Sequence, residues 1–306
     1  MVVARKIRAG LAPCSLGAWP TPLENAPALA AAAGLDTLWI KREDKAGGSK
    51  VRGLEFLLED APGMVYVTIG GTGSSHCLAT ATQAARVGGR AVLAQFPQPT
   101  SDGALAIATA CAARATIVNA RSMLTLPFAV WSAWRRAAAL GPRRWIPGGG
   151  AHPRAVIGHF LAGLELAQQL ANEPDAVVLP LGSTGTAGGL MLAMEALGWR
   201  TRVVGVRVAP AIVANGRRAR RLAQGARRIL GTVGVDVPRP RTPIVLNGAG
   251  RGYGYPSAAG EQARRLAAPH GLVLDSTYSA KAFAALPDVG RLGFRRVVFW
   301  HTFAHP

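Results

Sequence analysis

Short apolar runs along the chain alternate with segments of helical periodicity. The candidate strands are 64–70, 90–96, 115–119, 176–181, 202–208, 271–275 and 295–300. From Pro153 onward the spacing i, i+3, i+4, i+7 predicts a helix with one buried stripe: Ile157, Phe160, Leu161 and Leu164. Alternating strands and helices need crossover connections. The pattern therefore predicts an α/β fold with mainly parallel sheets covered on both faces.

Two glycine-rich turns each follow a predicted strand, one at 70–76 and one at 182–189. Ligands of parallel sheets bind beyond the carboxyl ends of strands, where such turns open helices. The second turn offers backbone N–H groups and the hydroxyls of Ser183, Thr184 and Thr186, which favours a phosphate. It lacks the ending of a P-loop and the glycine spacing of a dinucleotide site, and a tight packing turn is the alternative interpretation.

A single lysine, Lys50, directly follows Gly47, Gly48 and Ser49, in a chain with five lysines and thirty arginines. Glycines at such a point let a bulky ligand approach the backbone. Lys50 is then either a solvated residue at a helix start, as most lysines are, or an amine that forms a Schiff base. A Schiff-base lysine, a phosphate turn and a hydroxyl-rich turn on an α/β scaffold together match the needs of pyridoxal phosphate.

Six segments, in the family's order, resemble the fold-type II pyridoxal-phosphate enzymes, most closely the branch of D-cysteine desulfhydrase and 1-aminocyclopropane-1-carboxylate deaminase. They are PTPLENAP (20–27), KRED with GGSKVRGLEFL (41–57), TIGGTGSSHCLATATQAARVGGRAVL (68–93), GSTGTAGG (182–189), GRGYGYP (250–256) and LDSTYSAKAFAAL (274–286). The resemblance implies a tryptophan synthase β-like fold, with two parallel-sheet α/β domains and the cofactor between them. We expect a large domain from 1–55 and 165–306, a smaller inserted domain from 56–164, and a homodimer.

The resemblance also implies roles for particular residues. Lys50 looks like the Schiff-base lysine that moves the Cα proton, Ser74 like the serine beside the substrate, and Tyr253 and Tyr278 like the two active-site tyrosines. The cofactor-binding residues would be Lys50, Ser75, Ser279 at the pyridine nitrogen, and the phosphate loop Gly182, Ser183, Thr184, Gly185 and Thr186.

Several positions depart from the family pattern. The sequence Gly73-Ser74-Ser75-His76 replaces Gln-Ser-Asn-His, so Ser75 stands where an asparagine bonds the cofactor's ring oxygen. Ser49 stands where asparagine is common, and Phe303-Ala304 replaces Gly-Gly. These positions surround the substrate, so the resemblance predicts the chemistry better than the substrate.

The residue at the ring nitrogen predicts the type of reaction. A carboxylate there would keep the nitrogen protonated and make the cofactor a strong electron sink, whereas the hydroxyl of Ser279 would donate to a neutral ring. A weaker sink favours reactions in which a β-substituent leaves quickly. We therefore expect a lyase or deaminase that acts by α,β-elimination on a small amino acid and releases ammonia and a keto acid. The alternatives are β-replacement or racemisation, and more remotely a non-catalytic basic interaction protein.

The charge of +19 is partly concentrated in the segment 215–230. Because no zinc-ligand spacing or aromatic platform accompanies it, we expect an arginine-rich surface and no specific nucleic-acid partner. Runs of about 18 uncharged apolar residues are missing, so we expect no membrane span, and the N-terminal segment predicts no signal peptide. Three scattered cysteines indicate a reducing cytoplasm. The six histidines lack metal-ligand spacing and are interpreted as packing or surface residues, so we expect no metal.

Overall fold

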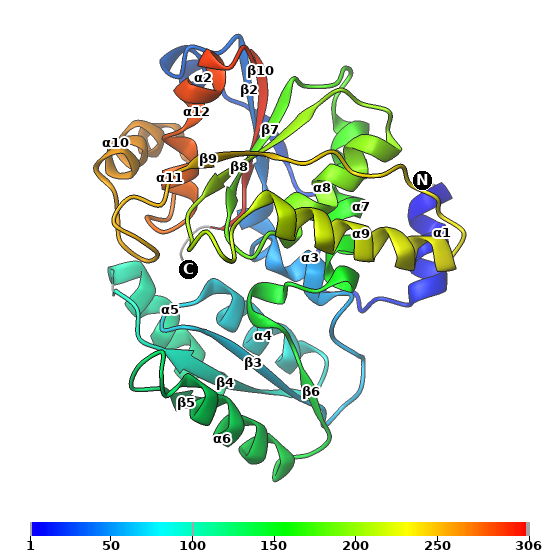
Figure 1. Cartoon of the computed structure of the whole chain (residues 1–306), viewed down its shortest axis with the longest axis vertical. Coiled ribbons are helices and arrows are strands. Elements are labelled where there is room, and N and C mark those ends of the chain that lie inside the picture. The colour runs from blue at the N-terminus through cyan, green and yellow to red at the C-terminus, as the bar shows by residue number, and fades with distance from the viewer. Residues whose placement is uncertain (1, 100, 304–306) are drawn as a thin grey trace.

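The computed structural model describes residues 2–99 and 101–303, and its strands form two sheets that lie one above the other in Figure 1. The six-stranded sheet has the order β1 (Leu23–Asn25), β2 (Thr37–Arg42), β10 (Arg296–His301), β7 (Ala176–Leu181), β8 (Arg202–Arg207) and β9 (Ile244–Asn247). The four-stranded sheet has the order β5 (Thr116–Asn119), β4 (Arg90–Phe96), β3 (Val65–Gly71) and β6 (Arg143–Trp145). All neighbouring strands are parallel except β1, which pairs antiparallel with β2.

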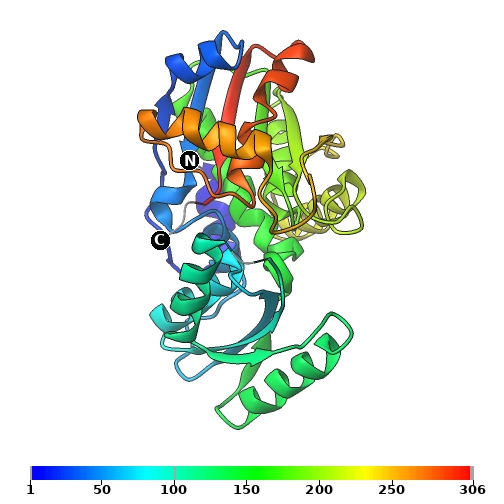
Figure 2. The same ribbon diagram turned by 90° about the vertical axis from the view of Figure 1, so that its left-hand side faces the viewer.

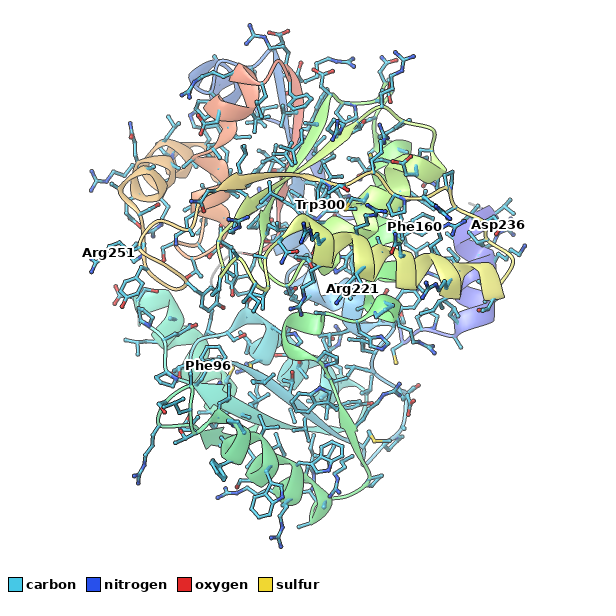
Figure 3. The ribbon with its side chains drawn as sticks, in the orientation of Figure 1. Phe96, Phe160, Arg221, Asp236, Arg251 and Trp300 are labelled. Atoms are coloured by element: carbon cyan, nitrogen blue, oxygen red, sulfur yellow. The ribbon has the colours of Figure 1, made fainter. Side chains whose placement is uncertain are left out.

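Both faces of the large sheet are covered by helices, which explains why its central strands are continuously apolar. One face packs against α7 (Pro153–Gln169), α8 (Gly185–Ala196) and α9 (Gly216–Thr232), through residues such as Val177, Phe160 and Trp300. Figure 3 labels Phe160 and Trp300 in this layer. The other face packs against α2 (Pro27–Ala32), α10 (Ala258–Ala267), α11 (Ser279–Phe283) and α12 (Leu286–Arg291). Successive side chains of one strand thus enter different cores.

The small sheet has its own core and its own helices. These are α4 (Ser75–Arg86), α5 (Asp102–Ala112) and α6 (Leu126–Ala138). The remaining elements are α1 (Val2–Leu11), α3 (Lys50–Leu54) and the 3₁₀ turns η1 (Glu43–Ala46), η2 (Gly148–Gly150) and η3 (Ala268–His270). Figure 2 shows the two sheets as an upper and a lower body. All strands of the lower body lie between β2 and β7 in the chain. The domain limits at 55/56 and 164/165 stay a prediction.

One predicted strand was wrong. Residues 271–275 form no strand in the described part of the chain, although Leu272 and Leu274 are buried and Val273 is 58% exposed. This alternation, which suggested a strand, comes from an extended segment that packs on the core between α10 and α11. The six other predicted strands were confirmed to within two residues at their ends. Among the described residues, no helix is both long enough and apolar enough to cross a bilayer.

Candidate active site

A cavity of about 630 Å³ lies between the two sheets, at the carboxyl ends of β3, β4, β7, β8 and β10. Its small-sheet wall includes Ser74, Ser75 and Phe96. Figure 3 labels Phe96 at the end of β4. Its large-sheet wall includes Lys50 and residues that follow β7 and β8. The cavity brings together nine of the predicted site residues: Lys50, Ser74, Ser75, Gly182, Ser183, Thr184, Thr186, Tyr253 and Tyr278. Gly185 and Ser279 do not belong to its lining.

The Lys50 amine lies against the second glycine-rich turn. Lys50 is the first residue of α3, and its Nζ donates to Ser183 Oγ at 2.9 Å and to the Gly149 carbonyl at 3.0 Å. Burial lowers the pKa of this amine to about 8. Gly149 has φ +66°, and a Cβ on it would lie 2.5 Å from Ser183 Cβ. A glycine is therefore needed for η2 to bring its carbonyl to Lys50.

The turn after β7 has an unsatisfied hydroxyl at the helix start. Thr184 is the N-cap of α8 and adopts φ +69°, a conformation that is uncommon outside glycine. Its Oγ1 is buried and has no hydrogen-bond partner in the described part of the chain. Gly185 begins α8, so the free N–H groups of that helix and the Thr184 hydroxyl meet at one edge of the cavity. This edge is suited to an oxyanion.

The turn after β3 presents a second helix start to the cavity. Ser74 caps α4 by accepting a hydrogen bond from Cys77 N at 3.4 Å, and Ser75 opens the helix. Gly73 has φ +82°, and a Cβ there would lie 2.5 Å from the carbonyl oxygen of Ala104 in α5. The close packing of α5 thus leaves no room for a side chain at Gly73 in this conformation.

His76 lines the cavity. The sequence analysis interpreted it as a packing or surface residue and did not predict this position. Thr68 Oγ1 donates its proton to the Ile146 carbonyl at 2.8 Å, so His76 Nε2, 2.9 Å away, must be the donor to Thr68. The other ring nitrogen, Nδ1, is then an acceptor, and it has no partner within the described residues. Burial, together with the nearby Lys50, lowers the His76 pKa to about 3, so the ring is neutral.

Tyr253 and Tyr278 reach the cavity from two different loops and join their hydroxyls in a short hydrogen bond. Their rings meet edge to face, with centroids 5.9 Å apart. Burial raises the pKa of both phenols, so both remain protonated at neutral pH. Lys281 supports this arrangement, because its Nζ donates to the carbonyls of Ala249 and Gly252 at 3.0 Å, just before Tyr253.

Ser279 lies next to Tyr278, but its hydroxyl is hydrogen-bonded to Asp275. Ser279 Oγ donates to Asp275 Oδ2 at 2.6 Å and accepts from the Asp275 N–H at 2.7 Å. The same carboxylate accepts hydrogen bonds from the backbone N–H groups of Thr277, Tyr278 and Ser279. Asp275 therefore fixes the start of α11, and the Ser279 proton is directed to a carboxylate. The assignment of Ser279 to a ring nitrogen stays a prediction.

A buried ion network holds the helix that carries Lys50. Two residues after Lys50, Arg52 donates to Glu43 Oε2 at 2.7 Å and to Glu165 Oε1 at 2.9 Å. Lys41 also pairs with Glu165, and the Arg52 guanidinium lies 3.8 Å from the centre of the Trp19 ring. The Glu43 side chain is fully buried and that of Glu165 is 12% exposed, so the network is largely shielded from solvent. Arg52 therefore attaches α3 to η1 and α7.

No cluster of three or more His, Cys, Asp or Glu residues in the described ranges could hold a metal ion. Ala304 and His305, the latter one of the six histidines, lie outside these ranges.

A family model described as "Pyridoxal-phosphate dependent enzyme" matches residues 14–302, and the chain belongs to this family. The protein is thus an enzyme that uses pyridoxal phosphate. A putative 1-aminocyclopropane-1-carboxylate deaminase from Pyrococcus abyssi is 30% identical over 297 residues, covering 93% of this chain and 89% of the relative. A D-cysteine desulfhydrase from Salmonella choleraesuis is 32% identical over 287 residues, covering 88% of this chain and 85% of the relative.

Among solved structures, a crystal structure described as an ACC deaminase homologue superposes with a TM-score of 0.83 at 28% identity. It covers 97% of this chain and 94% of that chain. The predicted fold-type II architecture is therefore confirmed.

The residues of the cavity fit the cofactor. Lys50 presents a buried primary amine, which a pyridoxal aldehyde requires. The start of α8, with the unpartnered Thr184 hydroxyl, presents neutral donors that a phosphate requires. The Lys50 amine lies 2.9 Å from Ser183 Oγ in the turn before α8. One molecule that carries both an aldehyde and a phosphate can therefore reach the amine and the start of α8.

Proposed function

We propose that this enzyme is a lyase that removes a β-substituent and then ammonia from a small amino acid, releasing a keto acid. Its relatives named for desulfhydrase and deaminase activities support this class of reaction. The observation that carries the proposal is the convergence of the Lys50 amine, the Ser74–Ser75 helix start and the Tyr253–Tyr278 pair on one cavity. When bound, pyridoxal phosphate supplies an electron sink for the substrate's Cα.

In this proposal Lys50 holds the cofactor covalently and then removes the Cα proton. Its lowered pKa allows a neutral amine near physiological pH, as a general base requires. The N-terminal end of α4, with the Ser74 hydroxyl, would bind the substrate carboxylate, because helix starts favour anions. The protonated phenols of Tyr253 and Tyr278 would donate a proton to the leaving group.

Formation of the covalent link between apoprotein and cofactor should speed up with rising pH and level off above about pH 8. The reason is that only the neutral amine attacks an aldehyde, and burial lowers the Lys50 pKa from 10.5 to about 8. Stopped-flow absorbance at the cofactor band gives the rate. Free Nα-acetyl-lysine serves as the control, with a midpoint at about 10.4. A protein midpoint close to that of the free amine would contradict the buried state of Lys50.

The reaction type is tested with a substrate panel. We expect cysteine, β-chloroalanine or O-acetylserine, in the D or L form, to release keto acid and ammonia, because each has a good β-leaving group. Alanine and 1-aminocyclopropane-1-carboxylate should react poorly if the Ser279 hydroxyl faces a neutral ring. Rapid turnover of the cyclopropane substrate, with none of the β-substituted ones, would refute the proposal. Racemised substrate, or new product only with an added nucleophile, would indicate the alternatives.

A homodimer and a cytoplasmic location complete the proposal; the first rests on the family resemblance and the second on the three scattered cysteines. The mass of the purified enzyme in solution tests the dimer. The exposed arginines of α9 have no part in the proposed reaction.

A further inference from the structure

One arginine of the basic segment differs from its neighbours. Arg218, in the first turn of α9, is half-buried and lines the cavity, whereas Arg217, Arg220 and Arg221 are exposed. Figure 3 labels Arg221 on this helix. The Arg218 backbone N–H is capped by Asn215 Oδ1 at 2.8 Å. Its guanidinium makes no hydrogen bond or ion pair with other residues in the described ranges.

The first turns of α8 and α9 are packed against each other. A Cβ on Gly188, in the first turn of α8, would lie 3.2 Å from the Ala219 carbonyl oxygen and 3.5 Å from Ala223 N. Glycine at 188 thus lets the backbone of α9 approach the helix that begins at the phosphate turn. Arg218 immediately precedes Ala219, so it is on the turn nearest to the start of α8.

The charges of the cavity lining indicate what this arginine binds. The described residues that line the cavity include no Asp or Glu, and their cations are Lys50 and Arg218, since His76 is neutral. A phosphate monoester carries close to two negative charges at pH 7, whereas a helix start provides about half a positive charge. Lys50 would be taken up by its bond to the cofactor's aldehyde. Arg218 is then the cation left to balance the phosphate.

The cationic side chains in the first turn of α9 have no acidic side chain in the same turn to balance their charge. Arg217 and Arg218 lie at the positive end of the helix dipole, and this turn contains no acidic residue. Cations are unfavourable at this end of a helix. An anion bound by Arg218 would relieve this repulsion.

We propose that Arg218 binds the phosphate group of pyridoxal phosphate, together with the start of α8. The inference rests on the proposed binding of the cofactor by Lys50 and residues 182–186. A planar guanidinium suits this task, because it donates two parallel hydrogen bonds to phosphate oxygens.

The test compares Arg218→Gln with Arg217→Gln, which removes the same charge from the same turn at an exposed position. Apoproteins are titrated with pyridoxal phosphate and with pyridoxal, which lacks the phosphate, and inorganic phosphate is used as a competitor. We expect Arg218→Gln to raise the Kd of pyridoxal phosphate roughly ten- to a hundredfold, as for a charge-assisted hydrogen bond. It should weaken competition by inorganic phosphate and change pyridoxal binding less than about twofold. Arg217→Gln should match the wild type, and Arg218→Lys should recover part of the affinity.

Two results would overturn the inference: an unchanged Kd for pyridoxal phosphate in Arg218→Gln, or equal losses for pyridoxal and pyridoxal phosphate. In the first case, a raised KM for substrates with a second acidic group would assign Arg218 to the substrate instead. Circular dichroism of both apoproteins checks that α9 remains folded. Failure of the wild type to bind pyridoxal phosphate through Lys50 would contradict the proposed function, a result distinct from either of these.

Discussion

Replacing Lys50 by arginine should abolish keto-acid release, with a loss of at least about a thousandfold, while the protein stays folded. Arginine keeps a cationic group that can donate to Ser183 and Gly149, as Lys50 does. A guanidinium, however, has too high a pKa to take a proton and does not form a stable covalent link to an aldehyde. The loss of a general base alone typically costs about 10²–10⁴ in rate. The measurement is turnover of the best β-substituted substrate.

Lys45→Arg is the matched control, because Lys45 is exposed and only five residues away. It should retain wild-type activity. Borohydride reduction of the wild-type enzyme, followed by peptide mapping, should place the reduced cofactor on Lys50. Label on Lys41, Lys45 or Lys281 would sink the assignment. Lys41 and Lys281 are already engaged, the first with Glu165 and the second with two backbone carbonyls.

Replacing Arg52 by methionine should destabilise the apoprotein by about 3–5 kcal/mol, because it leaves the buried Glu43 carboxylate without its cationic partner and removes one of the two cations paired with Glu165. Arg52 contacts both Glu43 and Glu165, and Glu43 is fully buried. The free energy of unfolding is measured in urea at neutral pH. Arg144→Gln, which breaks an exposed pair with Glu59, is the control and should cost about 1 kcal/mol or less. Similar small losses in both variants would show that the buried network contributes little.

The positions of most central strands could be predicted from the chain, because a strand covered on both faces is a continuous apolar run, as at 176–181. Residues 271–275 show the limit of this argument. Their buried and exposed positions alternate as in a strand, but a strand exists only where a second backbone pairs with it. That pairing depends on distant segments. Four strands, β1, β2, β6 and β9, were also missed, and two of them, β1 and β6, are only three residues long.

Site residues were predictable where a local motif carries the chemistry, as in the turns around Ser74 and Ser183. The positions of His76 and Arg218 at the cavity depend on the tertiary structure instead. The tautomer of His76 is set through Thr68 by a carbonyl at Ile146, 78 residues away from Thr68. Arg218 resembles the other arginines of its helix in sequence, and only the packing of α8 on α9 distinguishes it.

The contact between Ser279 and Asp275 did have a local signal. An aspartate that lies a few residues before a helix can accept hydrogen bonds from the free backbone N–H groups at the helix start. Asp275 does this for Thr277, Tyr278 and Ser279. The partner of the Ser279 hydroxyl is not predictable from this signal, because the orientation of a hydroxyl proton depends on all of its neighbours.

The Arg52 network has a further consequence for how the enzyme can move. Through Glu43 and Glu165 it fastens α3 to elements that belong with the large sheet, so Lys50 and the phosphate turn form one rigid unit. Ser74 and Ser75 belong to the small sheet's α4. A hinge motion that closes the cleft over a substrate would therefore have to slide α4 along α3, because Val51 and Leu54 of α3 share an apolar core with Cys77 and Ala79 of α4. In such a motion the ion network would keep the Lys50 amine with the large sheet, and the shared core would limit how far Ser74 and Ser75 can move relative to it.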